Sequence, residues 1–64
     1  MFENLRTELN KQEISLKEYA AALGITERAL RYKLSGRTDF TLSEIERTAA
    51  LIGISNWKYL FRRS

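Results

Sequence analysis

Apolar residues recur at intervals of three and four along most of the chain, which is the spacing of the buried face of a helix. The intervals predict a helix at the N-terminus that ends near residues 10–11, helices over 16–23, 27–35 and 42–52, and a last helical turn over 56–61. No segment shows the alternation of apolar and polar residues that is typical of a strand. The pattern therefore predicts an all-α fold of five short helices.

Residues that favour helix ends stand where this pattern places them. Ser15 with Glu18, and Thr41 with Glu44, have the spacing of a capping box, in which each residue satisfies a free backbone N–H of the other. Glycines follow three of the predicted helices, at positions where the left-handed conformation costs glycine little. We therefore expect helices to begin after Ser15, Thr26, Thr41 and Ser55 and to end at Gly24, Gly36 and Gly53.

The spacing also predicts which side chains of the last two helices face the core. In the helix over 42–52, the inward residues are Leu42, Ile45, Ala49 and Ile52. In the last turn, Trp57, Leu60 and Phe61 share a face that closes the core. Tyr59 should point elsewhere, because residues two apart in a helix are separated by about 200°.

The helix over 27–35 has one apolar side and one polar side. Leu30 and Leu34 lie four residues apart and mark the buried side. The opposite side is a continuous stripe of two guanidinium groups, a phenol and a hydroxyl, with no carboxylate. This stripe consists of Arg28, Arg31, Tyr32 and Ser35. A helix that is held by its predecessor and presents such a stripe fits the major groove of DNA.

Residues 16–36 resemble the helix-turn-helix of the Cro and phage-repressor class, the lambda-repressor-like or XRE family. That pattern has a small residue in the first helix, a glycine four later and an apolar residue six beyond, and these positions hold Ala20, Gly24 and Leu30. Where the pattern usually has another apolar residue, this chain has Lys33, and Leu34 is expected to supply the packing.

The resemblance covers nearly the whole chain, because residues 41–55 are similar to the family's fourth helix and 56–61 to its closing turn. It implies one compact, five-helix, lambda-repressor-like domain over residues 1–64, similar to small Cro-like regulators of phages and prophages. We expect residues 62–64 to be frayed.

The stripe and the resemblance together give candidate contacts to DNA bases. Arg28 and Arg31 are the strongest, since arginine bonds guanine bidentately, with about 1–3 kcal/mol of discrimination. Tyr32 could contact a thymine methyl group or a phosphate. Glu27 could accept from cytosine, but an acid in the first helical turn also suits the helix dipole, which we favour. For each residue the alternative is a solvated helix side chain.

Other polar residues near this helix are candidates for phosphate contacts, which add affinity without reading sequence. Lys17 stands at the start of a helix, where free amides favour anions and where family members touch the backbone. The loop after the 27–35 helix is also used by the family. The candidate phosphate contacts are Lys17, Thr26, Lys33, Ser35, Arg37 and Thr38.

Family members often dimerise through the C-terminal region, so the resemblance implies a homodimer, formed in solution or only on DNA. The aromatic residues there, Trp57, Tyr59 and Phe61, are the candidate dimer interface. The alternative is a terminal turn that packs wholly against its own core.

Charge is distributed unevenly along a chain whose net charge is +3. Residues 1–27 contain three bases and five acids, whereas residues 28–64 contain eight bases and three acids. Positive charge therefore begins at the stripe-bearing helix, as expected for a polyanionic partner.

Composition argues against several other classes. The absence of cysteine and histidine removes disulfides and the usual transition-metal ligands. The carboxylates are scattered and the glycines are spaced as helix stops, so we expect no enzymatic activity, no cofactor or metal and no small-molecule ligand. Apolar runs are too short for a membrane span or a signal peptide, which predicts a cytoplasmic protein.

These features predict sequence-specific binding of double-stranded DNA by a Cro-like transcriptional regulator, expected to be a repressor. A homodimer would read a palindromic operator whose half-sites are about 34 Å apart. The rival hypothesis is a helical protein-interaction module of the same fold that binds a regulatory protein. Its binding surface should carry apolar anchors, which the stripe lacks.

Overall fold

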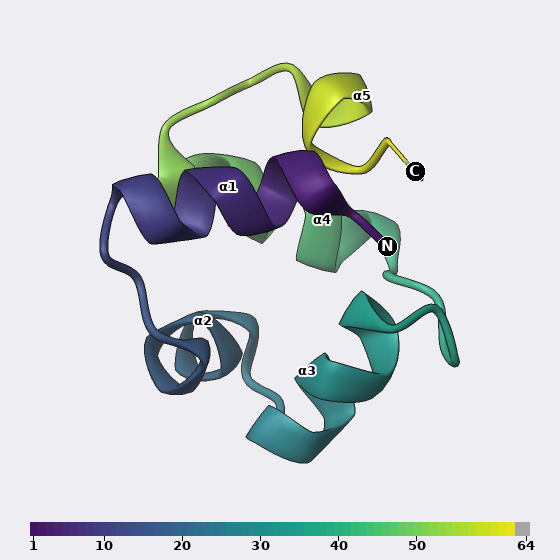
Figure 1. The fold of residues 1–64 in the computed structure, drawn as a ribbon. Helices are drawn as coiled ribbons and strands as arrows, with labels where there is room; N and C mark the ends of the chain where they lie inside the picture. Colours follow the sequence, from purple (N-terminus) through teal and green to yellow (C-terminus); the bar gives the residue numbers. More distant parts are fainter. Residues whose placement is uncertain (63–64) are drawn as a thin grey trace.

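In the computed structural model, which describes residues 1–62, these residues form five helices and no strand (Figure 1). The helices are α1 (Glu3–Lys11), α2 (Leu16–Leu23), α3 (Glu27–Leu34), α4 (Leu42–Ile52) and α5 (Trp57–Leu60). The predicted all-α class is confirmed, and the predicted boundaries agree to within one or two residues. Of the tail that we expected to be frayed, Arg62 is exposed and residues 63–64 lie outside the described residues.

Side-chain caps fix the starts of α2, α3 and α4 as predicted. Both capping boxes are present, with Ser15 Oγ accepting from Glu18 N at 3.1 Å and Thr41 Oγ1 accepting from Glu44 N at 3.2 Å. Thr26 Oγ1 accepts from the backbone N–H of Ala29 at 3.1 Å and begins α3.

The predicted cap of α5 is wrong by one residue. Asn56, and not Ser55, is the cap, and its Oδ1 accepts from Tyr59 N at 3.3 Å. Serine and asparagine are both favoured at the N-cap position, so residue type alone does not decide between them. The path of the loop from α4 determines which of the two precedes the first helical residue.

Glycines end α2 and α4 in the left-handed conformation, with φ of 72° at Gly24 and 79° at Gly53. Gly36 has φ of 86° and follows Ser35, the C-cap of α3. Any other residue at these positions would be strained, which is why the helix stops were predictable from sequence.

The core lies where all five helices meet. α2 packs on α3 and α4, and α5 packs on α1 and α4 (Figure 1). Its buried apolar members are Phe2, Leu5, Leu9, Tyr19, Ala20, Leu23, Leu30, Leu34, Ile52 and Leu60. None of the helices formed by residues 1–62 is both long enough and apolar enough to span a membrane.

The predicted inward face of α4 is partly wrong. Leu42 is 70% exposed, whereas Thr48, which periodicity did not select, is fully buried. Thr48 Oγ1 donates to the carbonyl of Glu44 at 2.7 Å and lies 2.8 Å from the Tyr19 hydroxyl, so its polar group is satisfied inside the core. Leu42 is the first residue of α4, and its side chain is rotated about 100° around the helix axis from the mean direction of Thr48 and Ile52. It therefore lies beyond the edge of the core.

The prediction that Trp57 closes the core is also wrong, because this side chain is 49% exposed. Leu60 alone is fully buried from α5. A helical-face prediction assumes a continuous helix, but α5 has only four residues and Phe61 already departs from it, with φ of −101° and ψ of 21°. Trp57 therefore stands at the open end of a single turn.

An aromatic cluster joins the two ends of the described chain to the loop between α3 and α4. The rings of Phe2, Phe40 and Phe61 meet edge to face, with centroid distances of 4.9 to 5.9 Å. Phe61 is thus committed to packing within the chain, as the core prediction required.

Candidate nucleic-acid interface

Three residues, Gly24 to Thr26, connect α2 to α3, and both ends of this connection are hydrogen-bonded. Ile25 N donates to Ala20 O at 3.0 Å, and Thr26 caps α3. Leu30 and Leu34 then anchor α3, since they are 0% and 2% exposed. The opposite face of α3 is consequently held toward solvent in a fixed orientation.

That face carries the predicted stripe. Arg28, Arg31 and Ser35 are exposed and Tyr32 is half-buried. Arg28 Nε donates to the Tyr32 hydroxyl at 3.2 Å, and the guanidinium carbon of Arg37 lies 4.5 Å from the centre of the Tyr32 ring. We call these three residues the Arg28–Tyr32–Arg37 cluster; it brings two cations to one aromatic ring by hydrogen bonding and cation–π attraction.

Arg31 lies outside this cluster and faces Glu27. Their charged groups are 3.8 Å apart, and the side chains are 65% and 43% exposed. Such an exposed pair contributes little and is readily exchanged for another anion. Glu27 lies in the first turn of α3, which agrees with the dipole interpretation of this residue.

Lys33, expected to contact phosphate, is turned inward instead. Its ammonium lies 3.0 Å from Glu44 Oε1 and donates to the carbonyl of Asp39 at 2.9 Å, and only 13% of the side chain is exposed. Burial raises the pKa of Glu44, but the hydrogen bonds from Thr41 and Lys33 and the charge of Lys33 outweigh it, so the pKa is lowered overall. This ion pair fills the place of the apolar residue in the family pattern, and we leave Lys33 out of the proposed contacts.

The other phosphate candidates differ in what their side chains can donate. Lys17, Thr26, Arg37 and Thr38 are exposed. The Thr26 hydroxyl accepts from the backbone, so its own proton is still available to a phosphate. Ser35 Oγ donates its only proton to Tyr32 O at 3.0 Å and would have to break that bond to donate elsewhere.

The dimer candidates lie away from α3, on the side of α5 (Figure 1). Trp57 is 49% and Tyr59 38% exposed, and the Tyr59 hydroxyl donates to Glu8 Oε2 at 3.3 Å. Because Phe61 belongs to the aromatic cluster, Trp57 and Tyr59 are the two aromatic residues of this set that remain accessible.

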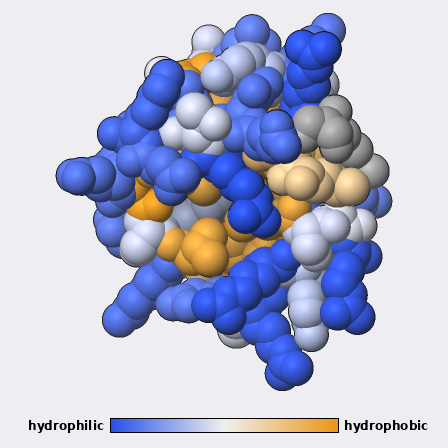
Figure 2. Space-filling view, in the orientation of Figure 1, coloured by the Kyte–Doolittle hydropathy of each residue, from blue (hydrophilic) through white to orange (hydrophobic). Residues whose placement is uncertain are grey.

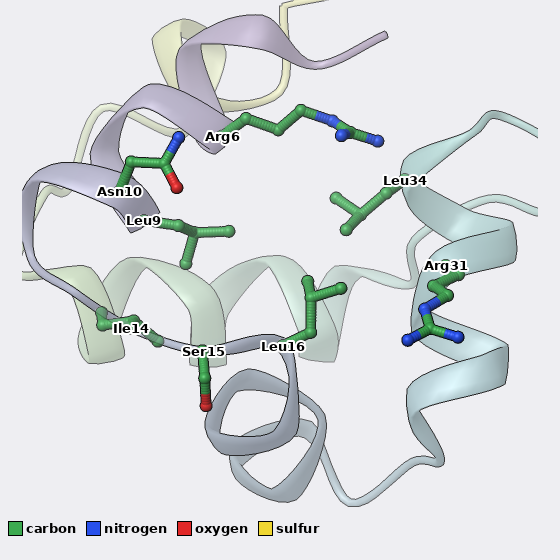
Figure 3. A pocket seen from close by; sticks show the side chains of 8 residues that line it. All are labelled: Arg6, Leu9, Asn10, Ile14, Ser15, Leu16, Arg31 and Leu34. Carbon is green, nitrogen blue, oxygen red and sulfur yellow. The ribbon is translucent and has the colours of Figure 1, made fainter.

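Sequence reasoning did not identify a hollow of about 520 Å³ that adjoins the stripe. Its walls come from α1, the start of α2 and α3, and Arg31 belongs to both the hollow and the stripe (Figure 3). The polar contribution of α1 consists of Arg6 and Asn10, which lie four residues apart. That spacing was visible in the sequence, but nothing local indicated that α3 would form the opposite wall.

No protein-family model matches this chain, and neither curated proteins nor solved structures gave a significant match. The resemblance to the lambda-repressor-like family therefore rests on the residues quoted from the sequence.

Proposed function

We propose that this chain is a lambda-repressor-like helix-turn-helix domain that binds double-stranded DNA in a sequence-specific manner as a Cro-like regulator. The observation that carries the proposal is the exposed face of α3, on which Arg28 and Arg31 project from a helix anchored by two buried leucines. Preorganisation of this kind lets both guanidinium groups reach base edges without reordering the fold.

In this proposal α3 enters the major groove, which at about 12 Å wide admits one helix. Arg28 and Arg31 bond base edges, and Tyr32 holds the guanidinium of Arg28 in place. Lys17 and Thr26 contact phosphates before α3, and Arg37 and Thr38 do so after it. These contacts set the orientation on the duplex without reading sequence.

A single eight-residue helix offers few base contacts, so the proposal includes a homodimer that reads two half-sites. Trp57 and Tyr59 provide its accessible aromatic surface. Bound across a promoter, such a dimer would exclude the polymerase and act as a repressor.

The test is selection of bound duplexes from a random-sequence pool at two salt concentrations, followed by sequencing. A palindromic motif and an affinity that falls steeply with salt are the expected result. The double substitution Arg28→Glu with Arg31→Glu reverses the charge at both positions and should abolish selection of a DNA motif. The matched control, Lys11→Glu with Arg62→Glu, changes the net charge equally at two exposed positions outside the stripe and should retain the motif.

The competing function is binding of a regulatory protein through the same fold. Weak binding at low salt with no enriched motif would refute the DNA proposal and favour this one. In that case charge reversal at Arg28 and Arg31 should not affect binding of a regulatory protein that contacts Trp57.

A further inference from the structure

The hollow between α1, α2 and α3 combines an apolar floor with a cationic rim. Leu9, Ile14, Leu16 and Leu34 form the floor, and Arg6, Asn10, Ser15 and Arg31 supply the polar lining. Figure 2 shows this floor as an orange area in the middle of the molecular face, surrounded by blue side chains. A volume of about 520 Å³ lies within the range of small-molecule sites.

The two arginines approach the hollow from opposite walls. Arg6 extends from α1 across the opening toward α3, and Arg31 extends from α3 back toward the start of α2 (Figure 3). No carboxylate lines the hollow, and the one ion pair that either guanidinium makes within the described residues is that of Arg31 with the exposed Glu27, at 3.8 Å. The N-terminus of α2, which carries partial positive charge, borders the same space at Leu16.

We propose that this hollow binds a small amphipathic carboxylate, with its apolar body on the leucine floor and its carboxylate between Arg6 and Arg31. The carboxylate accepts charge-assisted hydrogen bonds from both guanidinium groups and displaces Glu27 from Arg31. If the proposed function holds, the bound ligand withdraws Arg31 from the DNA and lowers DNA affinity.

The apolar floor favours this occupant over a phosphate of the DNA backbone. A phosphate with its sugars would satisfy the arginines but bring no apolar group to cover Leu9, Leu16 and Leu34. A neutral apolar molecule would cover the floor but leave Arg6 without a charged partner among residues 1–62 and Arg31 with only the exposed Glu27. An amphipathic carboxylate complements both parts.

Binding is tested with the full chain and sodium octanoate below its micellar concentration, by calorimetry and by amide chemical shifts. We expect saturable binding, with shifts concentrated at residues that line the hollow. Acetate, which lacks the chain, and octylammonium, which reverses the head-group charge, should not bind comparably. Absence of saturable octanoate binding, or equal binding of octylammonium, would overturn the proposal.

Arg6→Gln should weaken octanoate binding about tenfold, through loss of one charge-assisted contact. Lys11→Gln removes a cation of the same helix that does not line the hollow, and it should have no effect. If both variants weaken binding equally, net charge alone explains it and the assigned site is wrong.

Octanoate binding is measured without DNA, and its effect on DNA binding is measured separately. Failure of the ligand proposal can therefore be distinguished from failure of the proposed function. Octanoate should raise the DNA dissociation constant of the unaltered chain several-fold and that of Arg6→Gln much less. Octanoate binding by a chain that selects no DNA would support the ligand site and refute the DNA function. If Arg6→Gln weakens DNA binding itself and octanoate does not bind, the hollow holds a DNA phosphate and the ligand proposal fails.

Discussion

The Lys33 ammonium lies 3.0 Å from Oε1 of Glu44, the same oxygen that accepts the backbone N–H of Thr41 at 2.9 Å. One carboxylate therefore caps α4 and also holds the last turn of α3. The two side chains are only 13% and 12% exposed, so water screens the pair weakly. The pair therefore joins the last turn of α3 to the first turn of α4.

Replacing Glu44 by glutamine tests the strength of the link. Glu44→Gln keeps an oxygen that can cap Thr41 but leaves the Lys33 ammonium largely buried without a counter-charge. We expect a loss of about 1–3 kcal/mol in the free energy of unfolding, measured by urea denaturation. Glu46→Gln, an exposed position in the same helix, is the control and should change it by less than about 0.5 kcal/mol. Equal effects of the two substitutions would mean that the ion pair is energetically neutral.

The same carboxylate predicts how stability varies in acid. Burial raises the pKa of Glu44, but hydrogen bonding and the Lys33 charge lower it further, so the folded pKa lies below that of the unfolded chain. The stabilisation is complete above the unfolded value of about 4.3 and is lost as pH falls through the folded pKa, because the unfolded chain takes up the proton first. Unfolding free energies measured from pH 6 down to pH 2 should converge for the unaltered chain and Glu44→Gln. Parallel curves would show that Glu44 titrates normally.

A buried hydroxyl pair predicts a second pH effect, at the alkaline end. Thr48 gives its proton to the Glu44 carbonyl, so Tyr19 must donate to Thr48 Oγ1. Burial, aided by the charge of Glu44, raises the pKa of Tyr19 to about 12. Since the unfolded value is about 10, stability should be complete below that pH and fall by up to about 3 kcal/mol as pH rises to 12.

Tyr19→Phe removes the titrating group and is the control for this effect. It should cost about 1 kcal/mol at neutral pH, from the lost hydrogen bond to Thr48. Above pH 10 the difference in the free energy of unfolding between Tyr19→Phe and the unaltered chain should shrink. Thermal unfolding measures this difference, and tyrosine absorbance at alkaline pH follows the ionisation. If the difference in the free energy of unfolding stays constant up to pH 12, the Tyr19 hydroxyl is not held un-ionised by burial.

The Arg28–Tyr32–Arg37 cluster gives a prediction for DNA recognition. Tyr32→Phe keeps the ring under Arg37 but removes the hydroxyl that accepts from Arg28 Nε. We expect a relaxed preference at one base position with little change in the salt dependence of binding. Tyr32→Ala also frees Arg37 and should weaken binding to all sequences. Selected motifs and salt titrations of the two variants distinguish these outcomes, and identical motifs for Tyr32→Phe and the unaltered chain would rule out a role for the hydroxyl.

Sequence predicted the features of this fold that depend on a few neighbouring residues. Ser15, Thr41 and Gly24 determine helix ends through their own hydrogen bonds and dihedral angles, so their roles were visible without tertiary information. The exposed stripe was also predictable, because Leu30 and Leu34 fix the orientation of α3.

Features that require two distant segments could not be predicted in this way. Burial of Thr48 depends on the Tyr19 hydroxyl, 29 residues earlier, which turns a polar position into a core position. Lys33 is drawn inward by Glu44 across a loop, and the hollow exists only because α3 lies opposite Arg6. The errors at Leu42 and Trp57 share one cause, since both residues begin their helices at the edge of the core, where periodicity no longer determines burial.

The exposure of Trp57 leads to the prediction for dimerisation. Because this side chain is 49% exposed and follows the Asn56 cap, Trp57→Ala should change the free energy of unfolding by less than about 1 kcal/mol. Leu60→Ala, three residues later at a fully buried position, should cost about 2–5 kcal/mol and serves as the contrast.

If Trp57 forms the dimer surface, Trp57→Ala should lower the cooperativity of binding to a two-half-site duplex while leaving affinity for one half-site unchanged. Sedimentation of the protein–DNA complexes would report two bound chains for the unaltered protein and one for the variant at the same concentration. Two bound chains in both cases would place the dimer contact elsewhere.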